Sequence, residues 1–354
     1  MERDGQRNLL ICAYENRMEN EDGVRVLVAS LAKASPHLKL RLYHNPGSED
    51  FGQWVAQFPM VDWRPAHLSA DKNWNVKPWI LLEALDDGYQ DVLWLDADLL
   101  VSRDFTALID STDANSIVVA EEGNWGPPNA AGALRPRGGG LEVGRELPVS
   151  VNSCFLKVSA RHRPLIEEWQ TLLSRPDYLA AQTAPWDTRP PHMLGDQDVL
   201  MALLCSARHA AIPVRFLRRG HDILQLFGPL AFTLKERAVV AFRGLPLIIH
   251  AQGSKPWRDR AQTATRGWYE RLFAPYQDTS PYILFADRHL SATCRYAWLK
   301  PQTLSGRWLR ALGLGSMPLS GAPVAAIFDA VFGLSRLVRR LKTGKSGADV
   351  GRRG

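Results

Sequence analysis

The chain has 354 residues, of which 45% are hydrophobic and 23% charged, a composition typical of a globular protein with room for one large α/β domain or two smaller ones. Residues 300–354 carry a net charge of +8, so the remainder of the chain is slightly acidic although the total is +6. Nucleic acid is therefore not expected as a partner of the main domain. Four separated cysteines without a CxxC pair argue against a zinc or disulfide framework and fit a reducing compartment.

We find no secretory signal at the N-terminus and no apolar run of membrane-spanning length, so a cytoplasmic location is expected. Strand and helix patterns then alternate over about a hundred residues, with strands at 8–14, 38–44 and 91–96 and helices at 22–34, 48–58 and 73–88. Asp22 is a candidate N-cap for the first helix. This alternation predicts an α/β fold with a mainly parallel sheet flanked by helices, in which ligands bind at the carboxyl ends of strands.

The pattern continues with strands at 116–122, 149–159, 212–217 and 245–251 and helices at 163–174 and 195–204. Residues 123–146 are dense in Gly and Pro and are interpreted as a loop that covers the bound ligand. Arg135 and Arg137 in this loop are read mainly as solvated charges, with closure over a diphosphate as the alternative. The domain prediction is a catalytic domain at 1–290, a helical basic extension at 291–345 and a disordered tail at 346–354.

An acidic pair follows the strand "DVLWL", whose large apolar residues indicate burial on both faces. Asp96 and Asp98 stand at its carboxyl end, and ionised carboxylates in such a place need a cation or a basic partner. Residues i and i+2 of a strand point the same way, so both carboxylates can face one point. An acidic loop end that caps the next helix explains the pair equally well, and a phosphatase of the haloacid-dehalogenase group is a more distant alternative.

A second motif, "HAQGSKPW", follows the apolar strand near residue 249. His250 adds an imidazole to the two carboxylates, a ligand set suited to Mn²⁺ or Mg²⁺ with positions left for phosphate oxygens and water. Gly253 allows the backbone to approach a phosphate closely, and Lys255 supplies a positive charge for it.

With these motifs in the order Asp96-Ala97-Asp98, Asn152-Ser153, Asp196-Gln197 and HAQGSKPW, the chain resembles glycosyltransferase family eight over roughly residues 8–257. The resemblance implies a GT-A fold, a nucleoside-diphosphate sugar donor (UDP-sugar), a divalent metal and retention of anomeric configuration, as in glycogenin and the bacterial lipopolysaccharide hexosyltransferases. A glycan or lipid-linked saccharide is the implied acceptor.

The same resemblance implies roles for individual residues. The metal ligands are Asp96, Asp98 and His250. Gln197 lies nearest the reacting centre, and Asp196 contacts sugar hydroxyls. The donor is bound by the residues Lys77, Asn152, Gly253, Lys255 and Trp257. A non-catalytic sugar-nucleotide-binding or membrane-attached protein on the same fold is the alternative.

Apolar residues at steps of three and four, followed by arginines and a lysine, predict an amphipathic basic helix at 323–345. Such a helix either lies on an anionic membrane surface or packs on its own domain. The first alternative makes the enzyme peripheral on the cytoplasmic face of the membrane.

Overall fold

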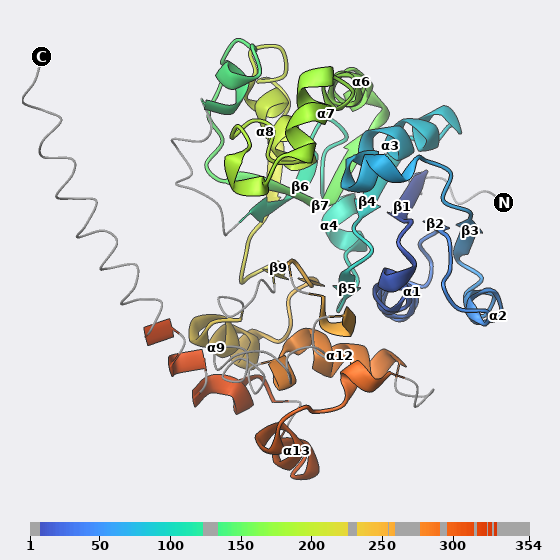
Figure 1. The fold of residues 1–354 in the computed structure, drawn as a ribbon, viewed down its shortest axis with the longest axis vertical. Helices are drawn as coiled ribbons and strands as arrows, with labels where there is room; N and C mark the ends of the chain where they lie inside the picture. The colour runs from blue at the N-terminus through green and yellow to red at the C-terminus, as the bar shows by residue number, and fades with distance from the viewer. Residues whose placement is uncertain are drawn as a thin grey trace, which may run out of the picture. The chain divides into compact units, whose positions relative to one another are not determined.

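The computed structural model describes residues 8–122, 134–225, 232–253, 255–258, 277–290, 296–314, 317–323, 325–327 and 329–330. By its contacts the chain divides into two compact units, Met1–Ile223 and Leu224–Gly354. The ribbon is coloured along the chain in Figure 1. The predicted boundary at residue 290 stays a prediction.

A seven-stranded sheet forms the centre of the first unit, with the strand order β3-β2-β1-β4-β7-β6-β8. Strands β1, β2, β3 and β4 pair in parallel, as do β6 and β8, whereas β7 is antiparallel to both of its neighbours. The predicted mixed, mainly parallel sheet is therefore confirmed. The strands are β1 (Leu9–Glu15), β2 (Leu40–His44), β3 (Val61–Arg64), β4 (Asp91–Leu95), β6 (Ile117–Glu122), β7 (Ser150–Ser159) and β8 (Val214–Leu217).

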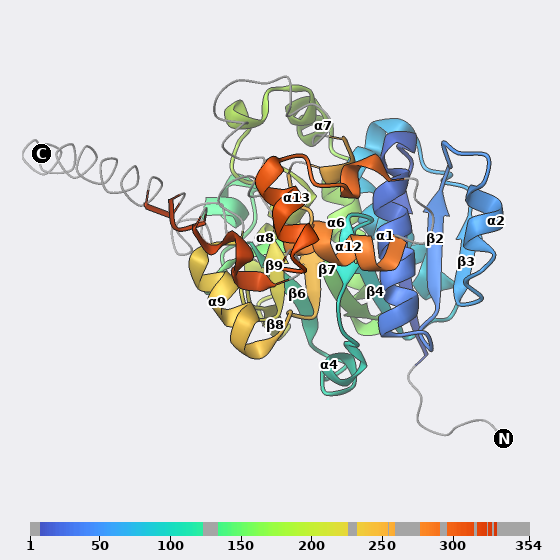
Figure 2. The same cartoon turned by 90° about the horizontal axis from the view of Figure 1, so that it is seen from below.

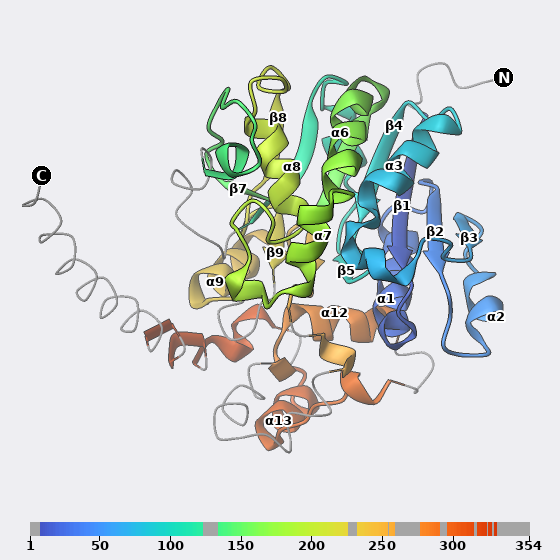
Figure 3. The same ribbon diagram turned by 45° about the horizontal axis from the view of Figure 1, so that its top comes forward.

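Helices cover both faces of this sheet, with α1 on one face and α3, α6 and α8 on the other (Figures 2 and 3). The longer helices of the unit are α1 (Glu21–Ala34), α3 (Lys77–Asp86), α6 (Arg163–Leu173), α7 (Pro176–Thr183) and α8 (Asp196–Cys205), and α2 (Phe51–Val55) and α4 (Thr106–Asp110) are short. The predicted cap Asp22 is wrong, because α1 starts at Glu21 and Asn20 occupies the N-cap position without a side-chain cap.

The core follows from the alternation of strand side chains. Leu10, Cys12 and Tyr14 of β1 join the cluster formed with α3, α6 and α8, while Ile11 and Ala13 are buried on the opposite face. All five residues of β4 are buried, as its apolar run predicts. Cys12, Cys154 and Cys205 are free buried thiols, and burial raises the pKa of the Cys12 thiol to about 12.

The register between β6 and β7 is irregular at one place. Val119 is opposite Leu156, but the next residue, Ala120, is opposite Asn152, so residues 153–155 of β7 have no partner on β6. Such a bulge breaks the alternation of side chains along a strand and re-aims them. It lies at the carboxyl ends of β4 and β6, where ligands are expected.

The predicted loop at 123–146 is wrong in part, since residues 134–138 are helical. Residues 123–133 lie outside the described part of the chain, as do 331–345 of the predicted basic helix and the predicted tail. The second unit holds α9 (Leu234–Arg243), β10 (Ile248–His250), α12 (Pro281–Leu290) and α13 (Leu304–Ala311). Its helix α9 begins with a capping box between Thr233 and Glu236. None of the described helices has the length and hydropathy of a membrane span.

Candidate active site

The acidic pair lies in a turn directly after β4. Asp96 follows the last strand residue, and its backbone N–H donates to the carbonyl oxygen of Cys154 at 2.8 Å. The N–H of Leu99 then donates to the carbonyl oxygen of Asp96 at 3.1 Å, which closes a turn through Asp98 before the short strand β5 (Leu99–Val101). The two carboxylates are thus brought together by a turn and not by the strand alternation that the sequence suggested.

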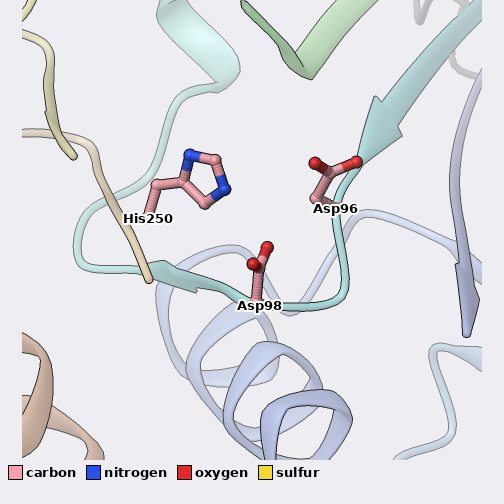
Figure 4. A group of neighbouring side chains, drawn as sticks. All are labelled: Asp96, Asp98 and His250. Carbon is pink, nitrogen blue, oxygen red and sulfur yellow. The ribbon is translucent and has the colours of Figure 1, made fainter. Parts of the chain in front are cut away.

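His250 is the last residue of β10 and is buried, with 4% of its surface exposed. One ligand atom each from Asp96, Asp98 and His250 lie within 4.8 Å of one another, and Figure 4 shows the three side chains facing one point. Because ligands on opposite sides of an ion stand about 4–5 Å apart at metal–ligand distances of ~2.0–2.6 Å, this spacing fits one divalent cation. These three side chains are a candidate metal site.

A buried lysine supports the acidic pair. Lys77, the first residue of α3, is 3% exposed, and its Nζ lies 2.9 Å from Asp196 Oδ2 and 3.3 Å from Asp96 Oδ1. Burial disfavours the ammonium, but the two carboxylates outweigh it and raise the pKa of Lys77 above its usual range. The lysine therefore remains charged and joins Asp96 to the start of α8.

Hydrogen bonds fix the orientation of this group. Lys77 Nζ donates to Ser153 Oγ at 2.6 Å, and the same hydroxyl donates to Asp196 Oδ2 at 2.8 Å. The indole N–H of Trp94 donates to Asp96 Oδ1 at 2.6 Å. The predicted donor-site residue Lys77 and the predicted sugar-contacting residue Asp196 therefore belong to one connected network.

A second network contains an acid that sequence reasoning missed. Glu122, the last residue of β6, is 5% exposed, and its Oε2 accepts from Asn152 Nδ2 at 2.7 Å. The same oxygen lies 3.5 Å from Gln197 Nε2, at the limit of a hydrogen bond. Two of the predicted site residues, Asn152 and Gln197, therefore share one buried carboxylate.

Arg135 corrects a sequence prediction, because it is not a solvated charge. It is 5% exposed, and its Nε and Nη2 lie 2.9 Å from Oδ1 of Asp198, in the first turn of α8. Arg137, by contrast, is exposed as expected. Burial raises the pKa of the Asp198 carboxyl to about 6, although Arg135 opposes the shift.

This pKa predicts an unusual pH dependence. Between about pH 6 and the unfolded-state pKa near 4, folded Asp198 is protonated while the unfolded chain is not, so the stability that Asp198 contributes rises as the pH falls. We expect the free energy of unfolding of wild type, relative to Asp198→Asn, to gain on the order of 2 kcal/mol from pH 7 to pH 4. Urea unfolding of both proteins at a series of pH values measures this difference in the free energy of unfolding. A constant difference between the two proteins would contradict the assignment.

The second unit carries the predicted phosphate-binding residues. Gly253 has a φ of 80°, a conformation that favours glycine, and Lys255 Nζ donates to the carbonyl oxygen of Ala251 at 2.9 Å. Trp257 is 9% exposed, and its ring packs against Tyr282 and Trp298 with centroids 6.2 and 6.0 Å away. The burial of Trp257 ties the HAQGSKPW segment to the core of its own unit.

Two tryptophans of the first unit, Trp74 and Trp79, differ in exposure. Trp74 is 41% exposed. Its Nε1 would lie 3.8 Å from a Cβ atom added at Gly195, the residue before Asp196. Trp79 is half-buried, with Lys72 Nζ 4.0 Å from its ring centroid.

No protein-family model and no curated protein matches the chain. Among solved structures, a galactosyltransferase, LgtC, in complex with donor and acceptor sugar analogues matches at 16% identity and a TM-score of 0.46, covering 79% of this chain and 96% of that one. Mouse xyloside xylosyltransferase 1 matches at 17% identity and a TM-score of 0.41, covering 70% and 97%. The glycosyltransferase GlyE from Streptococcus pneumoniae TIGR4 matches at 16% identity and a TM-score of 0.41, covering 81% and 64%.

Proposed function

We propose that this protein is a metal-dependent, retaining glycosyltransferase of the GT-A type. It moves a hexosyl group from a nucleoside-diphosphate sugar, with UDP as the expected nucleotide, to a glycan or lipid-linked saccharide. The observation that carries this proposal is the approach of Asp96, Asp98 and His250 within 4.8 Å. These are the ligands that the motifs of glycosyltransferase family eight place on one Mn²⁺ or Mg²⁺.

Cleavage of a sugar–diphosphate bond develops negative charge on the leaving phosphate, and a divalent ion held by the three ligands supplies Lewis-acid stabilisation of that charge. Lys255 adds a positive charge, and the backbone at Gly253 approaches the phosphate closely. In this proposal Trp257 keeps those two residues in place by packing.

The buried network holds the sugar. Oδ2 of Asp196 is already engaged by Lys77 and Ser153, and we assign its Oδ1 to a hydroxyl of the transferred hexose. We assign Gln197, next to it at the start of α8, to the position nearest the anomeric carbon. Asn152 acts on the donor site indirectly, through the hydrogen bond that its Nδ2 donates to Glu122.

Incubation of the purified protein with Mn²⁺ and a panel of nucleotide sugars tests the proposal. We expect slow, metal-dependent hydrolysis of one donor, and faster release of nucleoside diphosphate when saccharide acceptors are added. Analysis of the product by NMR should show the same anomeric configuration as the donor. Metal and nucleotide binding without turnover of any donor would favour the non-catalytic alternative, and release of inorganic phosphate from aryl phosphates would favour a phosphatase.

An anionic membrane surface is a further proposed partner, through the basic C-terminal region. Helix α13 with its C-cap residue supports this, because Leu304, Trp308 and the C-cap Leu312 are 71%, 62% and 64% exposed at steps of four residues. Arg307 of the same helix is exposed. Exposed apolar side chains with basic neighbours are typical of helices that lie in a membrane interface.

We therefore expect Trp308→Asp to reduce co-sedimentation with anionic vesicles several-fold, and high salt to weaken binding of the wild type. Trp186→Asp, at a 40% exposed tryptophan of the first unit, is the matched control and should bind as wild type. Deletion of residues 320–354 tests the predicted helix at 323–345 separately. Unaltered binding by both the Trp308 variant and the deletion would contradict membrane attachment.

A further inference from the structure

We propose that Glu122 is a positioning residue, which orients the side-chain amide of Gln197 so that its carbonyl oxygen faces the reacting sugar. The inference rests on the proposed sugar transfer and adds a residue that none of the motifs contains. Glu122 acts through Gln197 and does not itself touch the donor.

The position of Glu122 is fixed by a chain of hydrogen bonds. Asn152 donates through Nδ2 to Glu122 Oε2 at 2.7 Å, and its Oδ1 accepts from the backbone N–H of Cys154 at 2.9 Å. The carbonyl oxygen of Cys154 in turn accepts from the N–H of Asp96 at 2.8 Å. With both ends of its amide engaged, Asn152 has one orientation, and it ties Glu122 to the turn that carries the acidic pair.

The irregular register of β7 makes this arrangement available. Asn152 pairs with Ala120 of β6, two residues before Glu122, and the unpaired residues 153–155 follow directly. Residues 120–122 pair regularly with 150–152, so Asn152 and Glu122 are diagonal neighbours on one face of the sheet. The bulge that follows allows the neighbouring Ser153 to turn to Lys77 and Asp196. A regular strand would direct two successive side chains to opposite faces.

Chemistry then determines the orientation of Gln197. The Gln197 atom nearest Glu122 Oε2 is Nε2, so the amide presents its NH₂ group to Glu122 and its Oε1 points away from that oxygen. An Oε1 beside the anomeric carbon can stabilise the positive charge that develops there, whereas an NH₂ group in that place would oppose it. At 3.5 Å this contact is at the limit of a hydrogen bond, and hydrogen bonds of catalytic groups often tighten when substrate binds.

The variant Glu122→Gln tests the inference because it keeps the shape of the side chain and can donate as well as accept. The Gln197 amide can then flip, and we expect kcat to fall on the order of tenfold to a hundredfold, with little change in the KM of the donor. The matched control is Glu121→Gln, at the preceding residue of β6, whose carboxylate contacts Arg218 and Arg219. It should keep wild-type kcat.

A double-mutant cycle separates positioning from a structural role. In the Gln197→Ala background there is no amide to orient, so adding Glu122→Gln should cost little further activity. If Glu122 merely supports the fold, the same fold-loss recurs in that background and the inference is overturned. Unchanged kcat in Glu122→Gln also overturns it.

A measurement without substrate keeps the inference separate from the proposed reaction. The side-chain NH₂ signal of Gln197 in a ¹H–¹⁵N NMR spectrum can be assigned by its loss in Gln197→Ala. We expect this signal to shift in Glu122→Gln and to stay in place in Glu121→Gln. If wild type turns over no donor, the proposed function fails, while the NMR result still decides the contact: no shift in Glu122→Gln overturns it.

Discussion

Replacement of Asp98 by asparagine is expected to abolish metal-dependent sugar transfer, with a loss of at least about 10³-fold in kcat/KM. The change keeps the size of the side chain but removes one of two negative charges that would hold a divalent cation with His250. Stabilisation of charge on a leaving phosphate by such a cation contributes several kcal/mol, and each 1.36 kcal/mol corresponds to tenfold in rate.

Binding of Mn²⁺, followed by electron paramagnetic resonance or calorimetry, gives a readout independent of turnover. The affinity for Mn²⁺ should fall strongly in Asp98→Asn. Asp110→Asn, at an exposed position of α4, removes the same charge from the same part of the chain and should leave binding and turnover unchanged. Full Mn²⁺ affinity in Asp98→Asn would remove that carboxylate from the proposed ligand set.

The largest expected effect on stability is at Lys77. The variant Lys77→Met keeps an unbranched chain of similar length but leaves Asp196, which is 5% exposed, without its cation. Removal of one partner from a buried ion pair costs about 3–5 kcal/mol, because the other charge stays buried without compensation. The midpoint of urea unfolding should fall accordingly at an unchanged m-value.

Two further variants identify the cause. Lys77→Met combined with Asp196→Asn removes both charges and should recover part of the loss, since the cost comes from the unpaired carboxylate. Lys39→Met removes a charge from an exposed lysine and should change the free energy of unfolding by less than about 0.5 kcal/mol. Equal losses in the single and double Lys77 variants would mean that packing, and not charge, accounts for the effect.

The local pattern of apolar residues was sufficient to predict the strands that are buried throughout. β1, β2 and β4 lie within two residues of their predicted ranges, because nearly every residue in them is apolar or buried. β3 was missed, since its central residues Asp62 and Trp63 are exposed and it has no apolar run. The direction of β7 could not be predicted either, because strand direction depends on pairing with neighbours and not on the residues of the strand itself.

The candidate site likewise contains residues that the sequence predicts and residues that it does not. Motif spacing found Asp96, Asp98 and His250, since their residue types and order carry the chemistry. Glu122 has no such signal: it is the second of two successive acids, and only the pairing of β6 with β7 separates it from Glu121. Arg135 follows a Gly- and Pro-rich stretch that suggests a loop exposed to solvent. Its burial against Asp198 depends on contacts between residues distant in sequence.

The position of β7 between β4 and β6 also has a consequence for the order in which the sheet assembles during synthesis. The strands β3, β2, β1 and β4 are all complete by residue 95 and can pair with one another on the ribosome. β6 is made next, but its partners are β7 and β8, so it has no neighbour until residues 150–159 emerge. The hydrogen-bonding edge of β4 stays open over this interval, about 3–13 seconds at 5–20 residues per second. An open strand edge is a site of mispairing, so the nascent chain is exposed to mispairing at β4 while residues 96–159 are translated.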